Sequence, residues 1–428
     1  MAVAAARIPR SVAAVSDFAA ARYLYYGGVL TIGEPNLRPV LHLTVSDLFF
    51  FASLLALASI WLLDRRPLDI RVPAAVVAGT AVFAVGGLAS SLVSAHGVES
   101  FGELARVVYI TTIWFALSTV VLRTEDQIRN VTRLFALSVS LTALAAVVQF
   151  YGLQVGFILP GTQNFDKVYG TRMTGFTDHP NTLGAMCAIT LVPALGVLAV
   201  RARNVTAWIV GHAVVGVLLV GLLLSGSIGG LAAAVASLGA WTPWGWRTRR
   251  VRQTFAVLAL AVVAAGAYGG RGLLDSEVQR INTVTDPTSS TATGPGRLLL
   301  DQRAVSVIAQ SPLYGAGLDG LSSEEAMGGI GVHNMLLFAG VGGGILAMIG
   351  MVMILASVMA LGFRILRQTA REDGRSSGLA AILLASYVAF LVDGASAPIL
   401  YIRYGWMAAA ILVALRSIQV RNQGKRAA

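Results

Sequence analysis

Uninterrupted apolar runs recur along the whole chain, and they decide which folds it can adopt. Eleven runs are long enough to cross a membrane as helices, because a span needs about 20 apolar residues to cover about 30 Å of hydrocarbon. The alternating pattern of a membrane β-barrel does not occur. The predicted spans are approximately residues 45–63, 73–95, 104–122, 131–154, 180–200, 206–224, 228–246, 253–270, 333–362, 377–394 and 398–416.

A twelfth run, residues 11–33, is weaker because it contains Asp17 and Arg22. Only 12% of the residues are charged and 56% are hydrophobic, whereas a soluble domain has about 25% charged residues. No shift in composition separates a soluble domain from the apolar runs. We therefore predict an all-α polytopic membrane protein of about twelve transmembrane helices, with residues 1–428 forming a single transmembrane domain.

The formal charge of +11 is explained better by membrane topology than by nucleic-acid binding. When the spans alternate in direction, 20 cations fall in the connections on one side and 7 in those on the other. The positive-inside rule assigns the arginine-rich side to the cytoplasm. Residues 417–428 are then a cytoplasmic tail, and the connections 155–180 and 271–332 face the other side.

The two outer connections, 155–180 and 271–332, are unusually long, and connections of more than about 15 residues are typically functional or disordered. In the second, Thr283–Gly296 has the composition of a flexible loop. Arg297–Ala309 has helical periodicity and ends before Pro312. We expect this connection to carry short helices over an outward-facing cavity.

Polar residues cluster where the first connection meets the next span: Arg172, Asp178, His179, Pro180 and Asn181. Proline suits the first turn of a helix, so Asp178 or His179 would lie at the helix cap. In the other interpretation, Arg172 and His179 contact a substrate. The sequence favours the two roles equally.

The second connection contains a similar cluster. Cations are scarce on this side, so Arg172, Arg297 and Arg303 form a candidate anion clamp. Arginine presents a planar fork of donors that fits phosphate oxygens, although a solvated surface explains such residues as well. His333, which with Asn334 opens a span, is a candidate base or a hydrogen-bonding residue.

Several other features favour structural roles. Gly315 and Gly317 permit a positive φ or a close backbone approach, and Ser225–Gly230 has the small residues of tight helix packing. Asp393 and Arg403 lie near the outer ends of the last two spans, where we expect them to pair with each other. Asp47 and Glu103 are interpreted as residues at span boundaries.

Metal and redox sites have little support in the sequence. Cys187 is the only cysteine, so neither an internal disulfide nor a multi-cysteine metal site can form. The sequence contains no phosphate-binding loop, no dinucleotide fingerprint and no zinc-protease motif. We therefore expect neither a metal nor a cofactor.

Taken in chain order, the clustered residues resemble the bacterial O-antigen ligase/O-antigen polymerase superfamily from about residue 40 to residue 418. The step from Arg297 to Pro312, followed by a Gly-x-Gly, is the most specific element. The full set is Leu43-Thr-Val-Ser-Asp47, Arg172, Gly175, His179-Pro180-Asn181 with Gly184, Ser225-x-Ser227, Arg297, Pro312 with Gly315-x-Gly317, and His333-Asn334 with Gly340-x-Gly342.

The resemblance implies a GT-C-type glycosyltransferase of the bacterial cytoplasmic membrane, with its active site on the extracytoplasmic side. Such enzymes are metal-independent and inverting. They take a glycan from a polyprenyl-pyrophosphate carrier in the membrane lipid to a glycan or glycolipid acceptor, and they bind no nucleic acid.

Carried onto this chain, the resemblance makes Arg172 and Arg297 the pyrophosphate clamp and His333 the base or the group that orients the acceptor. Arg303 is added from the charge of the loop alone. The further candidate site residues are His179, Asn181, Asn334, Gly315, Gly317, Asp301 and Asp393.

The chain departs from the family pattern at three positions. Ile228 stands in place of an arginine, Asp301 in place of an aromatic residue, and Ala339 in place of an acid. Asp301, Asp319 or Asp393 is then a candidate for the missing acidic group.

The sequence does not separate a ligase from a polymerase. A flippase or transporter of lipid-linked sugars is the alternative, although no matched pair of broken helices occurs in two halves of the chain. A scaffold for envelope assembly would leave the arginine and histidine cluster unexplained.

Overall fold

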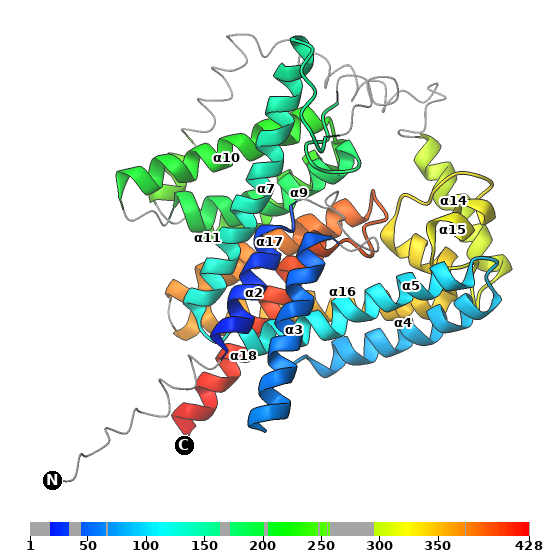
Figure 1. The fold of residues 1–428 in the computed structure, drawn as a ribbon, viewed down its shortest axis with the longest axis horizontal. Helices are drawn as coiled ribbons and strands as arrows, with labels where there is room; N and C mark the ends of the chain where they lie inside the picture. Colours follow the sequence, from blue (N-terminus) through cyan, green and yellow to red (C-terminus); the bar gives the residue numbers. More distant parts are fainter. Residues whose placement is uncertain are drawn as a thin grey trace.

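The computed structural model describes residues 18–33, 44–65, 67–162, 172–200, 204–246, 249–254, 256, 295–372 and 374–427. These ranges form helices joined by connections and contain no strand (Figure 1). The predicted all-α class is therefore confirmed for them. The expectations for 11–17, 163–171 and 257–294 lie outside the described residues.

Seven helices in the described ranges are long and apolar enough to cross a membrane, which confirms the prediction of a multi-span membrane protein. They are α3 (Val45–Asp64), α4 (Ala74–Val93), the continuous helix of α5 (Gly97–Val108), a π-helical segment (Tyr109–Trp114) and α6 (Phe115–Val121), α7 (Glu125–Gln154), α9 (Pro180–Ala194) with its π-helical continuation to Ala199, α10 (Val205–Ser225) and α16 (Met335–Glu372).

Three further helices lie at predicted spans: α11 (Ile228–Gly245), α17 (Gly374–Gly394) and α18 (Arg403–Ala427). In α17, the shorter apolar stretch is Gly378–Gly394. The described part of the weak first span is α2 (Ala19–Leu30), whose 12 residues fall short of the roughly 20 that a crossing needs. The total of about twelve spans stays a prediction.

Several predicted span boundaries differ from the ends of the helices. The helix expected at 104–122 begins at Gly97, because its first turns are amphipathic and do not raise the local hydropathy. The last helix begins at Arg403 and continues to Ala427. Residues 417–427 continue α18 as a helix, and their cytoplasmic position stays a prediction.

Several helix ends lie together around Arg172, and a Cβ on Gly229, at the start of α11, would lie 2.3 Å from Oγ of Ser396, just after α17. Arg172 lies beside the start of α9 and the end of α10, and the start of α16 contacts the residue after α17. We call this the Arg172 end. The opposite end, where α18 terminates, we call the Arg421 end.

The helix α9 forms the centre of the bundle, with 89% of its most apolar window buried. Glycines on α9 and α11 permit close contact between these two helices. A Cβ on Gly184 would lie 2.4 Å from the Cβ of Ser227, and one on Gly230 would lie 2.8 Å from the main chain of Gly184. The small-residue packing predicted for Ser225–Gly230 is therefore present.

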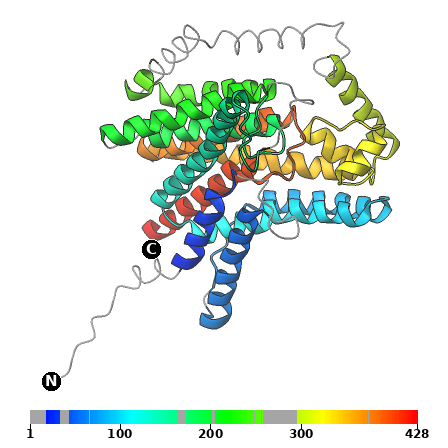
Figure 2. The same ribbon diagram turned by 45° about the horizontal axis from the view of Figure 1, so that its top comes forward.

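The helix α16 contains a break that anchors the segment before it. Gly344 has φ 71° and ψ −172°, which is not helical. Here the main-chain N–H groups of Ala316 and Gly317 donate to the carbonyls of Val341 (2.8 Å) and Gly342 (2.9 Å). Figures 1 and 2 show α14 (Pro295–Gln310) and α15 (Gly320–Ala326) beside this part of α16.

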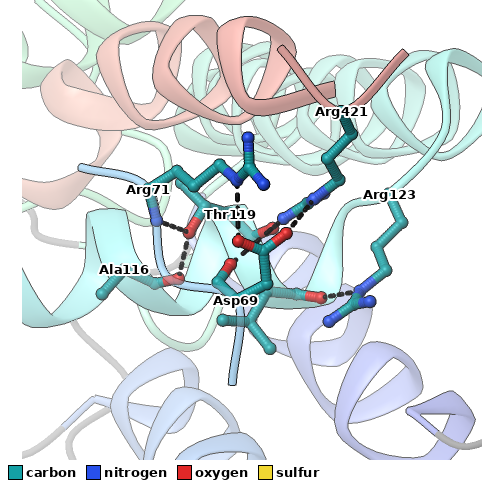
Figure 3. A network of polar contacts seen from close by, with 7 residues as sticks. Asp69, Arg71, Ala116, Thr119, Arg123 and Arg421 are labelled. Atoms are coloured by element: carbon teal, nitrogen blue, oxygen red, sulfur yellow. Dashed lines mark hydrogen bonds and ion pairs between the residues drawn. The ribbon is translucent and has the colours of Figure 1, made fainter. Parts of the chain in front are cut away.

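The Arg421 end is held by a network around Asp69 (Figure 3). The carboxylate of Asp69 accepts from Nε of Arg421 at 2.8 Å and from Nε of Arg71 at 2.7 Å. Nη2 of Arg421 also donates to the carbonyl of Thr119 at 2.7 Å. This network ties the last turns of α18 to the α3–α4 connection and to the end of α6.

Candidate active site

Arg172 is held in place by groups from two helices. Its Nε donates to the carbonyl of Ser225, at the end of α10, at 2.8 Å. Its Nη2 donates to Oδ1 of Asn181, in the first turn of α9. The next residue, Met173, donates its N–H to the carbonyl of Leu224 at 2.9 Å. The guanidinium is therefore fixed where α9 begins and α10 ends.

A buried glutamine shapes the loop behind Arg172. Oε1 of Gln149 accepts from the main-chain N–H groups of Thr174 (3.1 Å) and Gly175 (3.0 Å). Gly175 has φ +56°, and a Cβ there would lie 2.3 Å from the carbonyl oxygen of Thr142. Only glycine fits this turn. Gln149 was not among the predicted site residues, although its polar side chain near the end of an apolar span was the available signal.

His179 is the N-cap of α9, with Pro180 as the first helical residue, so the predicted capping role is confirmed. Its Nδ1 accepts from the N–H of Asn181 at 3.0 Å. In the neutral ring, Nε2 then carries the proton. Partial burial and the charge of Arg172 lower the pKa of His179 to about 4. This histidine is therefore neutral at physiological pH.

His333 precedes α16 and lies close to two residues of α14. Partial burial lowers the pKa of His333, and the nearby charge of Arg297 lowers it further, whereas Asp301 acts in the opposite direction. The charge of His333 also lowers the pKa of His179. The two clusters predicted from separate connections therefore meet at the Arg172 end.

Asn334 has a structural role. Its Oδ1 accepts from the N–H groups of Leu336 (3.0 Å) and Leu337 (3.2 Å), which caps the start of α16. Its Nδ2 donates to the carbonyl of Ala395 at 3.4 Å. This residue fixes the main chain on which His333 is carried.

Two buried polar atoms in this region have no hydrogen-bond partner among the described residues: Nε of Arg297 and Oδ2 of Asp393. Asp393 is only 2% exposed, and the charge of Arg297 acts on it. A Cβ on Gly229 would lie 3.5 Å from Oδ1 of Asp393. Unsatisfied buried polar atoms are costly, so both atoms are candidates for a contact with a bound molecule.

The predicted pairing of Asp393 with Arg403 was wrong. Arg403 forms an ion pair with Asp47, at the start of α3. Asp47 also accepts from the N–H of Thr44 at 2.8 Å in a capping box. The pairing was missed because Asp47 and Arg403 come from opposite ends of the sequence.

The structure does not bring Arg303 into this cluster. Arg303 is exposed, and a Cβ on Gly328 would lie 2.3 Å from its Nη2, so its guanidinium packs against the segment after α15. Gly315 (φ +64°) and Gly317 (φ +133°) allow the main-chain pairing with α16 described above. They position the site without lining it.

The site therefore combines Arg172, Arg297, His179, His333 and Asp393, all at one end of the bundle. Two permanent cations lie beside two histidines whose pKa values are lowered. Among the described residues, no group of three or more histidine, cysteine or acidic side chains is arranged to hold a metal ion. This arrangement suits an anion that carries several charges, with an uncharged proton acceptor beside it.

A family model described as O-antigen ligase matches residues 212–352, about a third of the chain. The match includes Arg297, Asp301 and His333, and it ends just beyond the helix break at Gly344. Arg172, His179 and Asp393 lie outside it. No curated protein matches the chain.

Proposed function

We propose that this chain, whose residues 212–352 match the O-antigen ligase family model, belongs to the O-antigen ligase/polymerase superfamily, and from that premise we infer a specific reaction for it. It is a membrane glycosyltransferase of the ligase/polymerase type. In our proposal it transfers a glycan from a polyprenyl-pyrophosphate carrier to an acceptor hydroxyl. The transfer inverts the anomeric centre and uses no metal ion.

What supports this proposal is that Arg172 and Arg297 each lie near a histidine of the candidate site, since Arg172 lowers the pKa of His179 and Arg297 lowers that of His333. The pyrophosphate leaving group gains negative charge as its bond to the sugar breaks. Two arginines compensate that charge, and each remains protonated at any working pH. The Ser225 carbonyl and Asn181 preorganise Arg172, so little reorganisation is needed during the reaction.

His333 is the proposed proton acceptor. The acceptor oxygen attacks the anomeric carbon, and the carbon–oxygen bond to the pyrophosphate breaks with its electron pair leaving on the pyrophosphate. The hydroxyl proton passes to the ring of His333, which is available because its pKa is lowered. A single displacement of this kind inverts the anomeric centre. Asp393, with its unpartnered Oδ2, is the second candidate for receiving the proton.

The proposed location is the bacterial cytoplasmic membrane, with the Arg172 end facing the extracytoplasmic side. The several spans support a multi-pass membrane protein. The arginines of the connections gather at the other end of the helices, around Arg71, Arg123 and Arg421, as the positive-inside rule requires for the cytoplasmic side. The donor lipid would then lie with its pyrophosphate at the level of the two arginines.

The test uses the purified protein in nanodiscs with a polyprenyl-pyrophosphate-linked glycan and EDTA. The measurements are release of polyprenyl pyrophosphate and transfer of the glycan. We expect Arg172→Ala, Arg297→Ala and His333→Ala each to lower the rate by about 10²–10³, the usual cost of losing one transition-state contact. Arg303→Ala is the matched control, since it removes an exposed arginine from the same helix as Arg297 and should keep most activity.

The outcome that would contradict the proposal is a folded wild-type protein that binds the donor but never cleaves it across a panel of acceptors. A liposome assay for flipping of the same lipid would then test the transporter alternative. Activity that EDTA abolishes would contradict the metal-independent mechanism alone.

A further inference from the structure

A cavity of about 640 Å³ lies beside the active site and is not used by the mechanism above. Its walls come from α3, α5, α9, α18 and the segment before α18. It includes the starts of α3, α9 and α18, so it opens at the Arg172 end. This position is near the ends of the helices and not at the middle of their length.

The lining of the cavity combines aromatic rings with hydrogen-bonding groups. Phe51, Tyr109, Tyr401 and Tyr404 supply rings. The polar part comprises the Asp47–Arg403 ion pair, Arg106, Asp178 and the hydroxyl residues Thr44, Ser46 and Thr182. Such a mixture matches a sugar, whose ring faces are apolar and whose edges carry hydroxyls.

The cavity adjoins the candidate site at the start of α9. Asp178 lines the cavity, and the next residue, His179, belongs to the active site. The buried Tyr404 lines the cavity as well, and its hydroxyl lies in the field of both Asp393 and Asp178. A molecule in the cavity is therefore separated from His179 only by the first turn of α9.

We propose that this cavity binds the first sugar units of the acceptor glycan, an inference that rests on the proposed function and assigns its acceptor subsite. Asp47 and Arg403 orient the sugar hydroxyls, and the tyrosine rings stack on the sugar faces. A polyprenyl tail is the competing occupant. An ion pair in the wall would be left facing that tail without compensating hydrogen bonds, which is unfavourable.

Gly102 offers a way to fill the cavity without disturbing the fold. It lines the cavity, and a Cβ built on it meets nothing within 4 Å. Gly102→Leu therefore adds a side chain into open space on α5. Gly102→Ala is the size control, and Gly239→Leu on α11, where a Cβ is equally unobstructed, controls for a new apolar side chain on a helix surface.

Binding is measured first, with the protein in nanodiscs and a panel of water-soluble di- and trisaccharides of hexoses and N-acetylhexosamines, by saturation-transfer NMR. We expect wild type, Gly102→Ala and Gly239→Leu to bind the same members of the panel. Gly102→Leu should weaken that binding by about tenfold or more. This measurement needs no turnover, so it tests the cavity even if the proposed reaction fails.

Transfer kinetics are measured second, and there Gly102→Leu should raise the KM for the acceptor while the affinity for the lipid-linked donor stays unchanged. Three results would overturn the proposal: no member of the panel binds wild type, Gly102→Leu binds sugars as well as Gly102→Ala does, or Gly102→Leu weakens the lipid-linked donor instead. Failure of the proposed function is separate, because it appears as absence of donor cleavage in wild type.

Discussion

Asn181→Ala tests whether Arg172 depends on its neighbours for its orientation. The substitution removes the acceptor for Nη2 of Arg172 and leaves the bond from Nε to Ser225 intact. A hydrogen bond to a charged group contributes about 1.5–3 kcal/mol. Because the hydrogen bond from Nε of Arg172 to Ser225 remains, we expect a loss of transition-state stabilisation in the lower part of this range. This corresponds to a decrease in kcat/KM of about ten- to thirtyfold.

The assay is glycan transfer from the lipid-linked donor, with a thermal melt of each variant to confirm folding. A double-mutant cycle with Arg172→Ala separates positioning from general damage. If Asn181 acts through Arg172, adding Asn181→Ala to Arg172→Ala costs almost nothing more. Asn181→Asp keeps an oxygen acceptor and should recover part of the activity. Additive losses in the cycle, or wild-type activity of Asn181→Ala, would refute the positioning role.

Three further predictions concern the pH profile, the loop behind Arg172 and the Arg421 end. Asp301 raises the pKa of His333, so Asp301→Asn should move the acidic limb of the kcat/KM profile to lower pH; an unchanged limb would contradict this. Gly175→Ala should lower the melting temperature, because a left-handed conformation costs a non-glycine residue about 1–2 kcal/mol and its Cβ would lie 2.3 Å from a carbonyl oxygen of α7. Asp69→Asn should cost about 1 kcal/mol in unfolding free energy after allowance for solvent screening. Burial raises the pKa of Asp69, but hydrogen bonds and charges from Arg71 and Arg421 lower it, and the lowering prevails. The extra stability of wild type over Asp69→Asn should therefore be present above the ordinary carboxyl pKa and disappear as the pH falls through the lowered pKa of Asp69.

The long helices could be predicted from the sequence because hydrophobic length is a local property. Segments such as 131–154 and 206–224 contain enough apolar residues to be recognised without their neighbours. The start of the helix at Gly97 could not, because its first turns alternate between exposed and buried positions. A hydropathy window averages such turns to a low value.

The site could be predicted in part because charged residues are rare in this chain. Arg172, Arg297 and His333 were recognised from their type and position, and the electrostatic coupling of His333 to Arg297 and to His179 fits that grouping. Helical periodicity favours Asp301 over Arg303 as a neighbour of Arg297, because residues four apart share a face and residues six apart do not. Applying this rule to the sequence would have removed Arg303 from the clamp.

The ion pair between Asp47 and Arg403 required the tertiary structure. Nothing local in the sequence links residues 356 positions apart, and Asp393 was the nearer candidate partner along the chain. The structure places Asp393 instead beside Gly229 and in the field of Arg297. The acid that was expected to hold a structural clip therefore belongs to the candidate site.

The glycine motif explains how two candidate site residues from separate segments keep a fixed relation. Arg297 lies near the start of α14, and the segment that follows α14 pairs with α16 through the N–H groups of Ala316 and Gly317. A Cβ on Gly315 would lie 2.6 Å from the carbonyl oxygens of Val341 and Gly342, so a side chain there would separate the two segments. Because His333 directly precedes the same α16, this contact fixes Arg297 and His333 against one helix. Glycines without any side chain can in this way set the relative positions of Arg297 and His333, both of which lie within the family match.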